Sequence, residues 1–176
     1  MNSFLENDKI RLRAVEPEDV KIITEVESDS SQWLDNCMCA PLSYQMITEY
    51  ALSYDADPFR AGQIRLMIEL KETKSIIGII DLYQISAQNR TAFIGIYILP
   101  RYRRQGLGLE SLSILEKYAY FLLNLNNFGA KIVYNNVESI NLFKKAGFTH
   151  SGTLPEWIQT GKVRRDLMIF TKKLLT

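Results

Sequence analysis

The sequence predicts an α/β protein with a mixed sheet of about seven strands and about four helices packed in layers. Three observations carry this prediction. A strand pattern, a glycine-rich corner and an amphipathic helix pattern follow one another between residues 92 and 123. Two pairs of apolar strand patterns are joined by short polar turns. Helical periodicity alternates with these strands in the rest of the chain.

The chain is expected to begin with a strand and a helix. Residues 9–14 alternate apolar and charged side chains, which is the pattern of a half-buried strand with Ala14 on its apolar side. Pro17 and the acids that follow it are typical of a helix start. A second helix is expected from Ser43, whose hydroxyl can cap it, to about residue 54.

Strand patterns dominate the remaining segments. Apolar runs at 64–70 and 76–85, with a polar turn between them, predict a hairpin. Residues 124–129 are rich in asparagine and end in glycine, so a loop is expected there before a strand at 131–134. The chain then closes with a short helix and a second hairpin, at 139–146 and 152–174.

The segment 92–123 organises the chain. Its first part is apolar and ends at Pro100, which cannot donate a hydrogen bond to a sheet. Its last part repeats apolar residues at three-to-five-residue spacings, with Leu122 expected on the buried face. Between them lie Gly106 and Gly108, next to arginines at 101, 103 and 104.

This corner suits an anion such as a phosphate. Glycine lets a backbone approach a ligand closely, and the free N–H groups of a helix start attract negative charge. A purely structural role for the two glycines stays open. No G-x-x-x-x-G-K-[ST] is present, which excludes a P-loop, and Ser111 stands where a dinucleotide-binding loop has its third glycine.

Two motifs of the chain belong together. Arg103, Gly106 and Gly108 form the pattern [Arg/Gln]-x-x-Gly-x-[Gly/Ala], and residues 136–148 form the pattern N-x-x-[Ala/Ser]-x-x-Leu-[Tyr/Phe]-x-K-x-G-F. These motifs resemble the pyrophosphate loop and a second signature block of the GNAT superfamily of acetyl-CoA-dependent N-acetyltransferases. The resemblance spans almost the whole chain. It implies a single acetyltransferase domain, 1–176, built on a mixed and mostly antiparallel sheet.

The resemblance also implies where acetyl-CoA binds. Backbone groups at the end of the organising strand would bond the pantetheine arm, and the glycine loop would hold the pyrophosphate. Asn136 would bond the pantetheine or its amide, and a role as a simple helix cap is compatible with that. The implied residues are Ile96, Tyr97, Ile98, Arg103, Arg104, Gln105, Gly106, Leu107, Gly108 and Asn136.

The chain departs from the family pattern at two catalytic positions. Many members have a tyrosine where this chain has Phe143, and phenylalanine cannot protonate the leaving thiolate. The serine of N-x-x-S, Ser139, is therefore expected to serve the thiolate, directly or through water, unless it is only a helix-start serine. The ribosomal-protein branch often has glutamate at the position of Phe93. Asp81, an acid inside an apolar strand, is expected to bind or deprotonate the amine, unless it is merely salt-bridged.

Composition excludes several other classes of function. The net charge of +1 gives no reason to expect nucleic acid, and no apolar run approaches the roughly 18 residues of a membrane span. Without a signal sequence, the chain is expected in the cytoplasm. Cys37 and Cys39 are expected to be reduced structural thiols, and the single histidine, His150, to be a strand residue. No metal is therefore expected.

The function that follows is acetyl transfer from acetyl-CoA to a primary amine, with a polyamine such as spermidine slightly ahead. A protein N-terminal acetyltransferase of the ribosomal-protein kind and a non-catalytic acetyl-CoA-binding module are the alternatives. Acids between residues 29 and 57 could attract a cationic amine, although exposed acids are usually just solvated. A small-molecule amine is the expected partner, and a homo-oligomer is left open.

Overall fold

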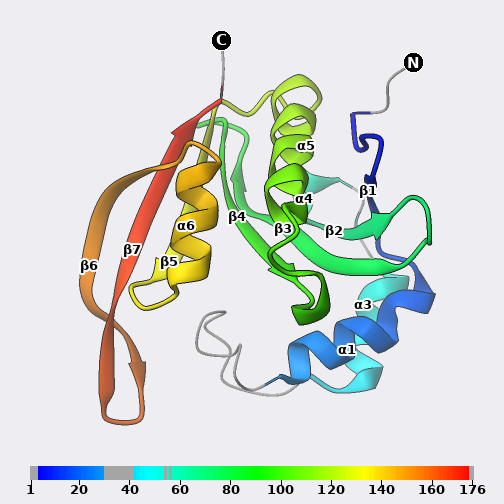
Figure 1. Ribbon diagram of the computed structural model, residues 1–176, viewed down its shortest axis with the longest axis horizontal. Coiled ribbons are helices and arrows are strands. Elements are labelled where there is room, and N and C mark those ends of the chain that lie inside the picture. Colours follow the sequence, from blue (N-terminus) through cyan, green and yellow to red (C-terminus); the bar gives the residue numbers. More distant parts are fainter. Residues whose placement is uncertain (1–3, 30–41, 54, 56, 175–176) are drawn as a thin grey trace.

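The computed structural model of the chain describes residues 4–29, 42–53, 55 and 57–174. Within them, seven strands form one sheet in the order β1-β2-β3-β4-β5-β7-β6 (Figure 1). Neighbouring strands run antiparallel except β4 and β5, which are parallel, so the expected mixed and mostly antiparallel sheet is confirmed. The strands are β1 (Ile10–Ala14), β2 (Gln63–Leu70), β3 (Ile76–Ser86), β4 (Thr91–Ile98), β5 (Asn127–Val133), β6 (Thr149–Thr160) and β7 (Val163–Lys173).

The described residues form five α-helices, one more than expected. Ser43 caps α3 as expected, because its Oγ accepts a hydrogen bond from the Met46 N–H. The unexpected helix, α4, is a single turn that begins at Pro58 and is capped by Asp57. No helix in the described part of the chain is long and apolar enough to cross a bilayer. The helices are α1 (Val20–Ser28), α3 (Tyr44–Leu52), α4 (Pro58–Ala61), α5 (Leu107–Phe121) and α6 (Val137–Lys145).

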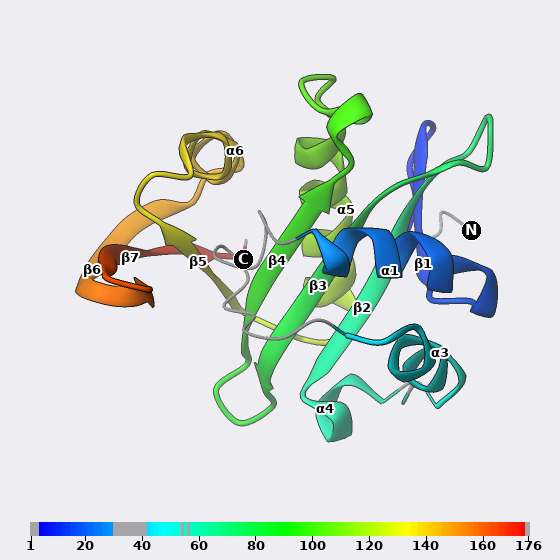
Figure 2. The same cartoon turned by 90° about the horizontal axis from the view of Figure 1, so that it is seen from below.

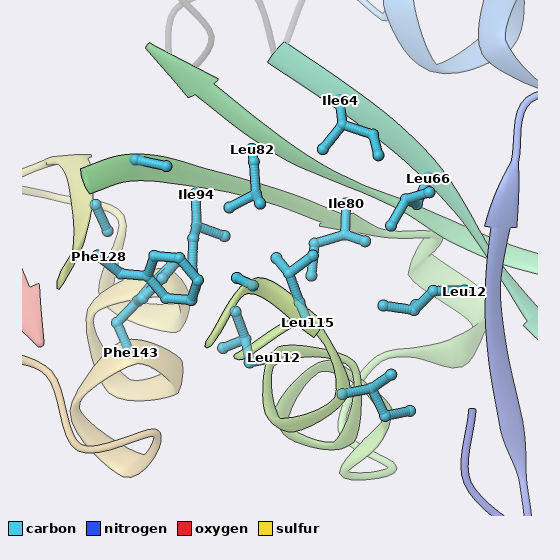
Figure 3. Packing of buried hydrophobic residues seen from close by; sticks show 14 of the residues in the cluster. Leu12, Ile64, Leu66, Ile80, Leu82, Ile94, Leu112, Leu115, Phe128 and Phe143 are labelled. Carbon is cyan, nitrogen blue, oxygen red and sulfur yellow. The ribbon is translucent and has the colours of Figure 1, made fainter. Parts of the chain in front are cut away.

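Helices cover the sheet on both faces, and alternate strand residues point to one face or the other. On the α5–α6 face, Leu112 and Leu115 of α5 pack against Ile80, Leu82 and Ile94 of the sheet (Figure 3). On the α1–α3 face, residues of α1 and α3 pack against Met67 of β2 and Ile79 of β3. Figure 2 shows α1 and α5 on opposite sides of the central strands.

Three details of the expected pattern are wrong. Ala14 is exposed and Val15 is buried instead, because β1 ends at Ala14 and the alternation ends with it. Leu122 is exposed, because α5 stops at Phe121 and the helical spacing no longer applies. Residues 127–129 are not loop but the start of β5, because they pair with residues 91–93 of β4. Cys37 and Cys39 lie outside the described residues, and His150 lies in β6 as expected.

β4 and β5 diverge after a short parallel ladder. β4 pairs with β3 as far as Ile98, but its ladder with β5 ends at Phe93. Figure 2 shows the two strands diverging from that point. The edge of β4 that faces β5 is therefore unpaired in its second half, and this opening positions the site described below.

A buried carboxylate ties β1 to β2 and to the turn before α1. Glu69 of β2 is 5% exposed and accepts hydrogen bonds from Arg11 and Arg13 of β1. Arg13 also bonds both oxygens of the buried Asp19. Burial raises the pKa of Glu69, but the hydrogen bonds from the two arginines outweigh burial and hold the pKa below its usual value.

We expect Glu69→Gln to lower the free energy of unfolding at neutral pH by about 1–3 kcal/mol, because it removes the buried charge that bonds Arg11 and Arg13, although Arg13 keeps its bonds to Asp19. Since the folded pKa lies below the unfolded one, the contribution of the carboxylate is present at neutral pH and is lost as the pH falls through the folded value. Urea unfolding across acidic pH should therefore show wild type and variant converging. Lys74→Gln is the control, because Lys74 is largely exposed and 4.0 Å from the same carboxylate. A constant difference at all pH values would contradict the assignment.

Candidate functional site

A cavity of about 730 Å³ lies where β4 and β5 diverge. Its walls come from both faces of the sheet. From the α1–α3 face it takes residues of both helices and of β2 and β3, and from the other face it takes three residues of α6. The cavity therefore joins the two faces at the open edge of β4. The α6 residues are Asn136, at its N-cap, Ser139 and Phe143.

Asp81 reaches this cavity as one member of an ion network. Asp81 on β3 lies opposite Arg65 on β2, and its two carboxylate oxygens accept hydrogen bonds from Arg65 Nε and Nη2 at 2.8 and 2.9 Å. The third member is Glu27 of α1, which is 8% exposed and accepts from Arg65 Nη1 at 2.7 Å. The expected alternative for Asp81, a salt-bridged residue, is thus part of the structure. It is compatible with a chemical role, since a carboxylate has further lone pairs.

The network carries two negative charges and one positive charge. Burial lowers the pKa of Arg65, but the charge and hydrogen bonds of Asp81 and the charge of Glu27 raise it above its usual value. Arg65 therefore stays protonated, and the network has a net charge of about −1. A cation entering from this face meets an excess of negative charge.

A second cation lines the cavity on the β5 side. The Lys131 Nζ donates a hydrogen bond to Gln84 Oε1 at 2.8 Å and lies 4.5 Å from the centre of the Phe93 ring. Phe93 stacks with Tyr83, and Lys131 also lies 5.8 Å from the centre of the Tyr83 ring. The cavity is therefore polarised, with carboxylates towards β2 and α1 and an ammonium group towards β5. In the described part of the chain, no cluster of metal-binding side chains is present.

The glycine corner precedes a helix end that no side chain caps among the described residues. Gly106 is the N-cap of α5 with φ +81°, and a Cβ at this position would meet open space. The start of α5 therefore has no side-chain cap, and its N-cap has a backbone conformation that favours glycine. Two arginines lie beside the corner, whereas the Arg101 side chain lies over the Tyr102 ring. Arg103 donates to the Ile98 carbonyl at 2.9 Å, and both Arg103 and Arg104 approach Glu138 of α6, at 3.8 and 3.3 Å.

The other loop residues have more modest contacts. Gln105 donates to the Arg101 carbonyl at 3.2 Å. Leu107 is buried as the first residue of α5. Gly108 lies against α6, because a Cβ there would come within 3.4 Å of the Leu142 side chain. The loop thus brings a helix start, glycines and arginines together, as the phosphate interpretation requires.

The open edge of β4 offers backbone groups to the cavity. The Leu99 N–H donates to the Ile77 carbonyl of β3, so by strand alternation the polar backbone groups of Tyr97 also face β3. Those of Ile96 and Ile98 then face the open edge. The bond from Arg103 to the Ile98 carbonyl agrees with this direction.

Asn136 and Ser139 meet at the start of α6. The Asn136 Oδ1 accepts a hydrogen bond from the Ser139 N–H at 3.0 Å, so the helix-cap role of Asn136 is present. Ser139 lines the cavity, and its Oγ makes no hydrogen bond within the described residues. Phe143 is 2% exposed and makes an edge-on contact with Phe148, so it belongs to the core as well as to the cavity wall.

Several residues of the site are missing from the sequence-based expectations. Arg65 is a charge inside an apolar strand, and the β2–β3 hairpin brings it directly opposite Asp81. A register shift between Ile68 and Glu69 lies between this pair and the turn, so counting from the turn does not reveal the pair. Glu27 belongs to a different element, 38 residues from Arg65, and no local pattern signals it. Lys131 likewise depends on how β5 meets β4. Of the acids between 29 and 57, Asp55 pairs with Arg60 and Asp57 caps α4, away from the cavity.

Comparison with known proteins connects this geometry to a family. The family described as "Acetyltransferase (GNAT) domain" matches residues 9–149. The "Uncharacterized N-acetyltransferase YoaA" of Bacillus subtilis (strain 168) is 28% identical over 97% of both chains. The "Spermidine N(1)-acetyltransferase" of Escherichia coli (strain K12) is 24% identical, over 90% of this chain and 83% of that protein. The crystal structure of spermidine N-acetyltransferase from Vibrio cholerae in complex with CoA and spermine superposes with a TM-score of 0.85 at 21% identity, over 96% and 97% of the two chains.

We expect Asn136→Ala to lower the free energy of unfolding by about 1 kcal/mol, because the N-cap acceptor for the Ser139 N–H is lost. Asn136→Asp should keep this cap and most of the stability, since a carboxylate also accepts the bond. Chemical denaturation of the three proteins measures the difference. Equal stability of wild type and Asn136→Ala would mean that the cap contributes nothing and that the residue serves a ligand alone.

Proposed function

The chain belongs to the GNAT acetyltransferase family, and we propose that its acceptor is a small-molecule primary amine, with a polyamine such as spermidine placed first. As a member of that family, it is an enzyme that transfers the acetyl group of acetyl-CoA. The observation that carries the proposal is Asp81, a carboxylate in the cavity at the open edge of β4. A carboxylate beside that edge can hold an amine where a donor along β4 could meet it.

The residues of the α5–α6 face fit the donor. The uncapped start of α5, with Gly106 and the neighbouring arginines, is suited to the pyrophosphate of acetyl-CoA. The backbone groups of Ile96 and the Ile98 N–H, at the open edge of β4, are suited to the amides of the pantetheine arm. The Ile98 carbonyl already accepts a hydrogen bond from Arg103, and the backbone of Tyr97 faces β3. When bound, acetyl-CoA supplies a thioester whose carbonyl carbon an amine can attack. Asn136 lines the cavity beside this path.

Acetyl transfer forms a C–N bond, breaks a C–S bond, removes a proton from the amine and returns one to sulfur. Asp81 is our candidate for binding the amine and accepting its proton, directly or through water. Ser139 is our candidate for the thiolate, since it lines the cavity and its hydroxyl makes no hydrogen bond in the described chain. The buried Phe143 offers no proton, which is why the serine is preferred.

The charge layout favours an amine that carries a further positive group away from β5. Glu27 and Asp81 outweigh Arg65 on the α1 side, whereas Lys131 opposes a cation on the β5 side. A di- or polyamine would therefore extend from Asp81 towards Glu27, between the apolar walls that α1 and α3 supply. The names of the relatives from Escherichia coli and Vibrio cholerae support the same acceptor class.

Two alternatives remain in competition. Phe143 and Ser139 are the features that favour a peptide N-terminus as the acceptor, as in the ribosomal-protein branch. A binding module without turnover would need the same residues on the donor side and no productive amine.

We also infer that the whole chain forms one acetyltransferase domain. Strand β7 lies beyond the residues that match the family, and it pairs with β5 along the whole length of β5.

We expect wild type to release CoA from acetyl-CoA with spermidine, spermine or putrescine, and less with Ala- or Ser-starting peptides. Asp81→Asn should lower kcat/KM for the amine by about a hundredfold without weakening CoA binding, because the amine loses its partner. Ser139→Ala should lower kcat more than it raises KM. Asp55→Asn breaks another Asp–Arg pair, an exposed one outside the cavity, and should retain activity.

Turnover with peptides alone would move the acceptor to the ribosomal-protein kind. CoA binding without release on any amine would leave the binding module standing. Thermal unfolding of Asp81→Asn separates loss of the Arg65 pair from loss of the chemistry, since a folded but inactive variant is the expected result.

If the arginines beside the glycine corner hold the pyrophosphate, replacing Glu138 should strengthen CoA binding rather than weaken it. This exposed carboxylate bonds Arg103 and Arg104 and would compete with phosphates for them. We expect Glu138→Gln to tighten CoA binding by about two- to fivefold, the scale of an exposed ion pair, and the gain to shrink at high salt. Calorimetric titration measures it, with the exposed Glu72→Gln as control. Weaker binding by Glu138→Gln would mean that Glu138 holds the arginines in position rather than competing for them.

A further inference from the structure

Gly95 of β4 has no structural reason to be glycine. Its φ is not in the left-handed region, so its backbone conformation suits any residue. A Cβ built on it would lie 3.8 Å from Asp81 Cβ and 3.8 Å from Tyr83 Cε1, which are ordinary contact distances. Alanine would therefore fit. Since glycine weakens a strand relative to alanine, the fold alone would favour alanine at this position.

The space that a side chain would fill belongs to the cavity. Gly95 pairs with Asp81 across β3 and β4, so a side chain there would share the α1–α3 face with the Asp81 carboxylate. The same virtual Cβ lies 3.9 Å from Asp81 Oδ2. The vacant volume thus has a carboxylate oxygen on one wall and an aromatic ring on another, and it adjoins the open edge of β4.

This pairing of walls suits an amine. An ammonium group is attracted by a carboxylate, and the apolar edge of the Tyr83 ring, whose Cε1 lies 3.8 Å from the virtual Cβ, suits the methylene group next to the amine. The Oδ2 atom accepts one hydrogen bond from Arg65 Nη2, and it retains a lone pair for a second donor. Phe93 stacks on the Tyr83 ring and Lys131 lies over both rings, so the aromatic wall is held in place.

We propose that Gly95 is a specificity-determining residue, whose missing side chain forms the slot through which the acceptor nitrogen passes from Asp81 to the acetyl group. The inference rests on the proposed function and adds to it a limit on acceptor size. The slot admits an unbranched amine, –CH2–NH2, more readily than an amine on a branched carbon. The acceptors that fit it best are thus the terminal amines of diamines and polyamines.

The test compares Gly95→Ala and Gly95→Val with Gly152→Ala, a β6 glycine with open space around it and no left-handed φ. Three quantities are measured: thermal unfolding, calorimetric affinity for CoA, and kcat/KM for spermidine and for an Ala-starting peptide. We expect Gly95→Ala to fold as well as wild type and to bind CoA equally. Its kcat/KM for spermidine should fall by about tenfold or more, the scale on which one methyl group is discriminated in a pocket, and Gly95→Val should lose more.

Each other outcome overturns a separate claim. Gly95→Ala with the kcat/KM of wild type would overturn the slot while leaving the proposed function intact. A parallel loss of CoA affinity would mean that residue 95 serves the donor and would overturn the slot as well. A wild-type enzyme that prefers the peptide would overturn the size limit. Wild type that acetylates no amine would overturn the proposed function itself, and this inference with it.

Discussion

The divergence of β4 from β5 is the constraint on which the rest of the site depends. Backbone N–H and C=O groups must find partners, and a strand inside a sheet normally finds them on both neighbours. β4 finds them on β3 along most of its length, but on β5 only at residues 91–93. The Ile98 carbonyl instead accepts a hydrogen bond from Arg103 of the glycine corner. The remaining open edge is a place for an extended ligand, and the cavity, the helix start and α6 are all arranged around it.

Each of the two strands is held by its other neighbour, which explains why they diverge. β5 pairs with β7 over its whole length, and β4 is tied to β3 in the same way. At the point of divergence the Phe93 ring lies on Gly129, where a Cβ would come within 2.5 Å of Cε1 of the ring. Tyr83 and Lys131 then fill the space beside Phe93 on the α1–α3 face. The Phe93 ring therefore covers the last paired residue of β5, at the point where the two strands begin to diverge.

The sequence predicts the features that depend on residues close together in the chain. The caps by Ser43 and Asn136 involve residues three positions away, and the glycine corner follows from a strand, a proline and a helix pattern in sequence. The sequence does not predict the start of β5, because the asparagines and glycine of residues 124–129 favour a loop and pairing with β4 overrides that preference. Asp81 stands out in the sequence as an acid inside an apolar strand. Glu27 does not, because its contact with Arg65 is made between elements that are distant in the chain.

In the proposed reaction, the sheet lies between the two substrates. The glycine corner, α5 and α6 lie on one face, and the Asp81 network with α1 and α3 lies on the other, so the proposed donor and acceptor sites adjoin each other where the sheet is open. In this proposal a proton for sulfur comes from the α6 wall. Phe143 cannot give one, and a hydroxyl in its place would be surrounded by the apolar core. Ser139 lies one helical turn earlier on the same side of α6. Moving the hydroxyl by one turn keeps the core apolar and still leaves a donor at the open edge of β4.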